Sequence, residues 1–274
     1  MPRYLIPLVL ALGLVFPAHA QQDAAVETLF DALGLPEILN IMREEGVSYG
    51  IDIETDLFDG RGGDRWAAIV EELYDIEAMT ATVLGRMQAE LSAADVDPML
   101  AFFTGETGAR IVGLEVSARR AMLDEAVDAA SREAYRQLEL DKDPRLDLIR
   151  AYVEANDLVE NNVVGAMNSN YAFYAGLADG GAFPDELTED QILTDVWSQE
   201  EMIREDTLEW LYSYLSLAYK PLTEADLEAY VAFSETEAGG MLNRALFASF
   251  DEMFVAQSLA LGLGAANFIS AQEL

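Results

Sequence analysis

The chain has no cysteine, one histidine (His19) and two lysines (Lys142 and Lys220) among its 274 residues. Without cysteine it can form no disulfide, thiolate nucleophile, Cys–zinc site or acylated lipoprotein anchor. Fifty acidic residues against 16 basic ones give a net charge of −34. Phosphate contacts need lysine and arginine, so this charge balance argues against a nucleic-acid partner.

The first twenty residues have the features of a secretory signal peptide. Arg3 is their only charge, residues 5–16 form an apolar run, and Ala18-His19-Ala20 supplies the small residues that precede a cleavage site. The run is shorter than the roughly 20 helical residues that cross a bilayer. We therefore expect cleavage after Ala20, a periplasmic location in a Gram-negative bacterium, and no stable membrane anchor after cleavage.

Cleavage would also remove His19, so the exported chain would contain neither histidine nor cysteine. Those two residues supply the common general base near neutral pH and the Ser-His and Cys-His nucleophile pairs. Zinc and haem are likewise held mainly by histidine and cysteine. We therefore expect no cofactor and no resident metal.

The remaining chain predicts an all-α fold. Apolar residues recur at intervals of three and four, as at Leu242, Leu246 and Phe250, whereas a strand would need alternation. Helix starts are marked by Pro36 and by short capping sequences such as the one that begins at Thr223. The pattern is typical of a helical bundle.

The sequence also repeats itself. Residues 91–112 (LSAADVDPMLAFFTGETGARIV) align without gaps on residues 222–243 (LTEADLEAYVAFSETEAGGMLN). We predict two tandem, internally similar helical units, residues 21–143 and 144–274, packed together as one domain. Each unit should contain an early helix (36–57; 145–178), a middle helix pair or single long helix (64–91; 188–219), a short helix (93–103; 224–234) and a long final helix (106–140; 237–270).

The turn between the short and the long helix is the best-preserved part of the repeat. Phe102 or Phe233 ends the short helix, Glu106 or Glu237 lies in the first turn of the long one, and Gly108 or Gly239 follows. A glutamate there favours the positive end of the helix dipole. Glycine lowers helix stability by about 1 kcal/mol relative to alanine, so its presence in both copies predicts that another helix passes close over it. We interpret these six residues as a structural turn.

The same pattern of Leu-Ser/Thr, Asp, an aromatic residue, a glycine-containing turn and a long helix resembles domain-of-unknown-function family 2059. The resemblance is clearest over residues 208–246 and recurs over 84–115. Both copies depart from the family's usual turn, because neither has its proline, Ser234 replaces an aromatic residue and Gly105 replaces a serine. The resemblance implies a secreted, all-helical envelope domain and brings no activity or catalytic residues.

A segment rich in asparagine and aromatic residues is the candidate ligand site. Asn161, Asn168, Tyr171 and Tyr174 lie on helical stripes where amides adjoin aromatic rings, which suits a sugar or peptide. The alternative is that these amides bridge helices or face solvent. A separate, acidic segment contains Asp52, Glu54, Asp56, Asp59 and Asp64, whose carboxylates could bind calcium in the loop they precede. Such clusters also arise by chance in an acidic chain, so the sequence leaves open whether this loop binds calcium.

We expect a non-enzymatic binding or interaction module that holds an unknown envelope protein or a small ligand. The alternative is a hydrolase, for example glycosidase-like, that uses paired carboxylates such as Glu71-Glu72 or Glu200-Glu201. The spacing of Glu106 and Arg110, and of Glu115 and Arg119, predicts two ion pairs along one helix.

Overall fold

The computed structural model describes residues 18–183 and 187–272, and this part of the chain contains helices, turns and loops but no strand. The all-α prediction is confirmed. The helices are α1 (Ala18–Ala32), α2 (Leu35–Phe58), α3 (Gly63–Leu73), α4 (Ile76–Glu90), α5 (Ala93–Phe103), α6 (Glu106–Ala121), α7 (Glu125–Asp141), α8 (Arg145–Ala155), α9 (Leu158–Asp179), α10 (Glu189–Trp197), α11 (Glu200–Tyr219), α12 (Glu224–Ser234) and α13 (Glu237–Gln272).

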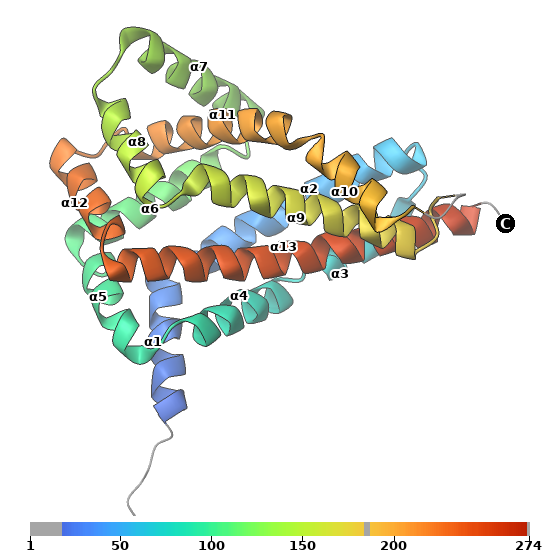
Figure 1. Ribbon diagram of the computed structural model, residues 1–274, viewed down its shortest axis with the longest axis horizontal. Helices are drawn as coiled ribbons and strands as arrows, with labels where there is room; N and C mark the ends of the chain where they lie inside the picture. Colours follow the sequence, from blue (N-terminus) through green and yellow to red (C-terminus); the bar gives the residue numbers. More distant parts are fainter. Residues whose placement is uncertain (1–17, 184–186, 273–274) are drawn as a thin grey trace, which may run out of the picture.

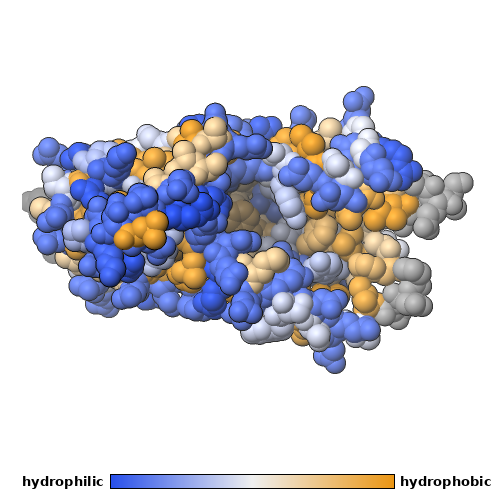
Figure 2. Space-filling view, turned by 90° about the horizontal axis from the view of Figure 1, so that it is seen from above, coloured by the Kyte–Doolittle hydropathy of each residue, from blue (hydrophilic) through white to orange (hydrophobic). Residues whose placement is uncertain are grey.

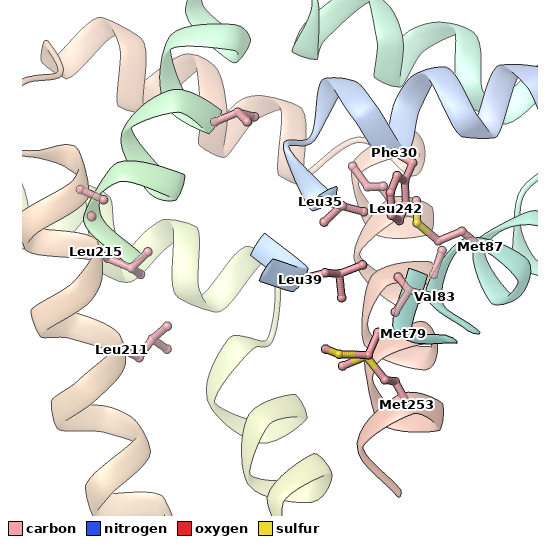
Figure 3. Close-up of a cluster of buried hydrophobic side chains, with 14 of the residues drawn as sticks. Phe30, Leu35, Leu39, Met79, Val83, Met87, Leu211, Leu215, Leu242 and Met253 are labelled. Carbon is pink, nitrogen blue, oxygen red and sulfur yellow. The ribbon is translucent and has the colours of Figure 1, made fainter. Parts of the chain in front are cut away.

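The long helix α13 organises the bundle (Figure 1). It lies along α9 on one side and α4 on the other, while α5, α8 and α12 gather near its first turns. One buried apolar cluster includes side chains from both halves of the chain. Figure 3 shows part of it, with Phe30, Leu39 and Val83 near Leu242 and Met253 of α13. Burial of such side chains is the main force that stabilises the fold.

Two predicted helices are broken, which corrects the expected boundaries. The predicted helix 106–140 ends at Ala121 and restarts at Glu125, because the Asp124 carboxylate accepts a hydrogen bond from Ala126 N at 2.8 Å and caps a new helix. The predicted helix 145–178 breaks at Asp157, whose φ of 50° is left-handed. Asparagine and aspartate tolerate that conformation better than most residues. By contrast, the short helices 93–103 and 224–234 are confirmed at both ends.

The signal-peptide prediction lies mostly outside the described residues, which begin at Ala18. The predicted cleavage point, between Ala20 and Gln21, falls inside the first turn of α1. Just beyond it, the Gln22 amide donates hydrogen bonds to the backbone carbonyls of Gln88 and Leu91 at the end of α4, at 3.2 and 2.8 Å. The exported chain would therefore keep both of these hydrogen bonds, which its second residue donates to α4.

Residues 237–269 of α13 form the one segment of the described chain that is long and apolar enough to cross a membrane. The same segment contacts α3, α4, α5, α9 and α12. An apolar helix at the centre of a bundle meets the same criteria of length and composition, and these contacts place α13 within the bundle.

Arginines bridge helices across the acidic surface. Arg120 of α6 contacts Glu37 and Glu44 of α2 at 2.6 and 2.5 Å, and both Arg132 and Arg136 of α7 contact Glu209 of α11. Pairs this exposed contribute little to stability, because water screens the charges. Figure 2, from above, shows a mostly hydrophilic face that is hollowed near its middle, with hydrophobic residues inside the hollow.

In both structural turns the backbone of another helix lies close over the glycine, as predicted. A Cβ on Gly108 would lie 2.2 Å from the carbonyl oxygen of Phe102, and one on Gly239 would lie 2.3 Å from that of Phe233. The neighbour in each case is the end of the preceding short helix. The two phenylalanine rings stack on each other with centroids 4.4 Å apart. The turns thus meet ring to ring at one end of the bundle.

We predict that Gly239→Ala lowers the free energy of unfolding by about 1–3 kcal/mol, because a backbone carbonyl cannot move aside for the added methyl. The matched control is Gly240→Ala in the same helical turn, where the nearest atom is the flexible end of Arg244 at 3.4 Å. That variant should be neutral or gain up to about 1 kcal/mol. Urea unfolding of both variants measures the difference, and equal stabilities would contradict the contact.

Candidate functional site: a groove and an inner chamber

A groove of about 700 Å³ lies between α9 and α13. Its apolar surface comes from side chains such as Val164, Phe247, Phe250 and Phe254, and its polar groups are mainly amides and one carboxylate. Val164 is 54% exposed and Phe254 37%, so apolar surface here faces solvent. The polar lining residues are Asn161, Asn162, Asn168, Ser169, Asn243 and Asp251.

The groove exists because α9 and α13 separate toward their N-terminal ends. At Gly176 a Cβ would lie 2.3 Å from the carbonyl oxygen of Leu259, and at Gly262 it would lie 2.2 Å from that of Phe173, so the backbones touch there. At Gly165, three turns earlier, a Cβ would meet nothing nearer than the Asp251 carboxylate at 3.9 Å. The two helices are thus in contact at one end and open at the other.

The structure brings together half of the predicted ligand residues. Asn161 and Asn168 line the groove, and the Asn168 amide donates a hydrogen bond to Asp251 at 2.9 Å. Tyr171 instead points toward α10, where its hydroxyl donates to Glu189 at 3.2 Å. Tyr174 contacts the ring of Phe173 outside the groove lining. The aromatic partners of the amides are phenylalanines of α13, which periodicity alone marked as core.

A smaller chamber of about 180 Å³ adjoins the groove. Tyr152, Asn243 and Leu246 line both cavities, so the two meet at these residues. The chamber lies beside the structural turns, and Phe233 and Gly239 form part of its wall. Its other aromatic walls are Phe103, Tyr152, Tyr214 and Tyr230. No basic side chain of the described chain lines it.

Glu115 of α6 is the single carboxylate in the described lining of the chamber. The Tyr219 hydroxyl donates to its Oε1 at 2.6 Å, and the Tyr214 hydroxyl donates to its backbone carbonyl at 3.1 Å. Burial raises the pKa of Glu115 to about 7, although hydrogen bonds from Tyr219 and Tyr230 act in the opposite direction. Loss of hydration therefore dominates, and the side chain holds its proton through most of the acidic range.

Neither predicted arginine pair on α6 forms. Arg119 contacts Glu45 of α2 at 2.6 Å and lies over the Trp210 ring, 4.7 Å from its centroid. Arg110 contacts Asp226 at 3.4 Å and donates to the Pro221 carbonyl at 2.7 Å. Spacing along the helix predicted the pairs, but both arginines contact carboxylates of other helices instead. Glu115 is thereby left among tyrosines, which the sequence pattern did not indicate.

The acidic segment and the glutamate pairs are not assembled as sites. In the described residues no three histidine, cysteine, aspartate or glutamate side chains are placed to share a metal ion. Glu54 instead accepts a hydrogen bond from Gly63 N at 2.9 Å, and Asp59 contacts Arg61. Glu71, Glu72 and Glu201 are exposed, while Glu200 contacts Arg204 at 2.8 Å.

No protein-family model matches this chain, and neither a curated protein nor a solved structure matches it. The site's residues and geometry are therefore the basis for assigning it a role.

The raised pKa of Glu115 predicts how stability depends on pH. Between the ordinary value of 4.5 and about 7, the folded chain holds this proton and the unfolded chain releases it. The free energy of unfolding should therefore fall as pH rises through that window, by roughly 3 kcal/mol from this group. Glu115→Gln, which cannot ionise, should remove this fall.

Urea unfolding at several pH values measures the effect, with the exposed Glu71→Gln as the control that removes the same formal charge. Parallel pH profiles for the wild type and Glu115→Gln would show that Glu115 ionises as an ordinary surface carboxylate does.

Proposed function

We propose that this protein is a non-enzymatic binding module whose α9/α13 groove holds a small ligand with an apolar body and polar groups. The observation that carries the proposal is a groove of about 700 Å³ that combines three phenylalanines, one of them exposed, with a row of amides. Ligand sites are commonly cavities of this size, largely apolar with a few placed polar groups. Phe254 and Val164 would lose exposed apolar surface on binding, which favours association.

The polar side of the groove can make specific hydrogen bonds to a ligand, in addition to the non-specific burial of its apolar surface. Asn168 holds Asp251 in place, and the Asn243 amide donates to the Asn156 carbonyl at 2.7 Å. Amide oxygens and the second Asp251 oxygen can accept hydrogen bonds from a ligand. The glycosidase-like alternative needs two inward carboxylates about 5–9 Å apart, whereas Glu115 is the single acid of the described chamber lining.

A filling substitution tests the groove directly. Gly165→Trp places a large ring in the open space between α9 and α13, where no backbone opposes the new Cβ. The neutral fluorophore N-phenyl-1-naphthylamine should bind the wild type with enhanced emission, and Gly165→Trp should abolish that enhancement. The control is Gly85→Trp on the exposed face of α4, where a Cβ also meets nothing within 4 Å.

Equal enhancement in wild type and both variants would place the fluorophore elsewhere and overturn the proposal. Thermal unfolding of all three proteins shows that the folds are comparable. Both substitutions remove a helical glycine, so neither should lower the melting temperature through helix propensity.

We further propose that the chain consists of two tandem related units, 21–143 and 144–274, as the internal sequence repeat indicates. The support is that corresponding helices make corresponding contacts. α1 contacts α5 as α8 contacts α12, and α4 lies on α13 as α11 lies on α6. The last two contacts cross from one unit to the other, which favours a single intertwined domain.

The proposed site of action is the periplasm, after removal of residues 1–20. The support is the charge and apolar run of the first residues and the acidic composition of the rest. Intact-mass measurement of protein recovered from a Gram-negative periplasm should give a chain that begins at Gln21. A mass that includes His19 would refute the cleavage and the absence of histidine from the exported protein.

A further inference from the structure

We propose that the inner chamber is a subsite for an organic cation, and that it receives the ammonium head of a ligand whose apolar body lies in the α9/α13 groove. The inference rests on the proposed function of the groove and names the chemical class of its ligand. Three features carry it: one carboxylate with no cationic side chain in the chamber lining, aromatic walls, and an apolar groove that joins the chamber.

The carboxylate lacks a positive partner where it would need one. Arg119, one turn along α6, is engaged by Glu45 and by the face of Trp210. The described lining of the chamber contains Glu115 and no arginine or lysine. A buried ionised carboxylate costs several kcal/mol unless it is paired. A bound cation would supply that missing partner.

The walls are of the kind that bind cations. Tyr152 and Tyr230 lie at 4.5 Å between ring centroids, and their hydroxyls are 3.0 Å apart. The Phe103 and Phe233 rings meet edge to face at 5.2 Å. Aromatic faces attract an ammonium group most strongly when water is excluded, and sets of such rings are a known means of binding quaternary amines.

Size and charge favour a head group over a whole ligand. About 180 Å³ is smaller than the 300–1,000 Å³ usual for a complete small-molecule site, whereas the adjoining groove of about 700 Å³ lies in that range. Asp251 adds a second negative group along the groove. The net charge of −34 raises the local concentration of cations around the protein and lowers that of anions.

Binding of the cation should depend on pH because it needs ionised Glu115. Burial sets the pKa of Glu115 at about 7, and burial raises the pKa of the tyrosines that surround it, so they remain neutral. Arg119 of the same helix is already paired with α2. The other titratable groups that face Glu115 are Tyr152 of α8, Tyr214 and Tyr219 of α11, and Tyr230 of α12.

The experiment compares hexyltrimethylammonium with hexanol, which has the same tail and no charge, by isothermal titration calorimetry at about pH 8 and about 0.15 M NaCl. The cation should bind the wild type about tenfold or more tightly than hexanol. Glu115→Gln should remove that preference, while Glu71→Gln, an exposed site of equal charge, should keep it. Between about pH 8 and pH 6 the wild-type affinity for the cation should fall, and that of Glu115→Gln should not.

Each outcome separates the two proposals. If Glu115→Gln retains the full preference, the cation binds through the acidic surface or Asp251, and the chamber is not the subsite. If hexyltrimethylammonium and hexanol bind the wild type equally while Gly165→Trp still blocks the fluorophore, the groove proposal stands and the cation inference is wrong. Circular dichroism confirms that Glu115→Gln is folded, as expected for a variant relieved of a buried ionisable group.

Discussion

The backbone contact between α9 and α13 at Gly176 and Gly262 is the constraint on which the rest of the site depends. Neither position has room for a β-carbon, so the two helix backbones touch there, and the Asn168–Asp251 hydrogen bond joins the helices nearer their N-terminal ends. Toward the N-terminal ends of α9 and α13, the side chains between the helices do not fill the space completely. Phe247, Phe250 and Phe254 line the cavity that remains between the two helices.

Electrostatics give the inner chamber its second property. A chain with 50 acidic residues has many carboxylates, and almost all can face water at little cost. Glu115 differs because four tyrosines from three helices surround it and its neighbouring arginine is engaged elsewhere. Its raised pKa follows from lost hydration rather than from repulsion between acids. In the described part of this highly charged chain, the chamber lining thus holds one carboxyl whose pKa lies near neutrality.

The repeated turn connects these features. Stacking of Phe102 on Phe233 places the two glycine turns against each other, and Phe103, Phe233 and Gly239 then form one end of the chamber wall. Residues that look purely architectural in the sequence therefore shape the cavity. The groove opens from that same end of the bundle, so the architecture and the candidate site share one set of contacts.

Much of the fold follows from local rules that act within a few residues. Helical periodicity, the capping pairs at Ser92 and Thr223, and the glycines at 108 and 239 predicted the all-α class, the short helices and the tight turns. Asn161 and Asn168 were identified because amides on one helical stripe stand out. The breaks near Asp124 and Asp157 were missed, since aspartate is compatible with both a helix and its end.

The sequence by itself determined composition-level facts: the acidic excess, the lack of thiol chemistry, and helices whose apolar faces require partners. Only the tertiary structure decided which helices became those partners, because burial is non-directional and many pairings satisfy the same periodicity. The pairing of Arg119 with Glu45, the position of Glu115 among tyrosines, and the hydrogen bond from Asn168 to Asp251 all join residues far apart in the chain. Their chemistry depends on distance in space, which no local spacing specifies.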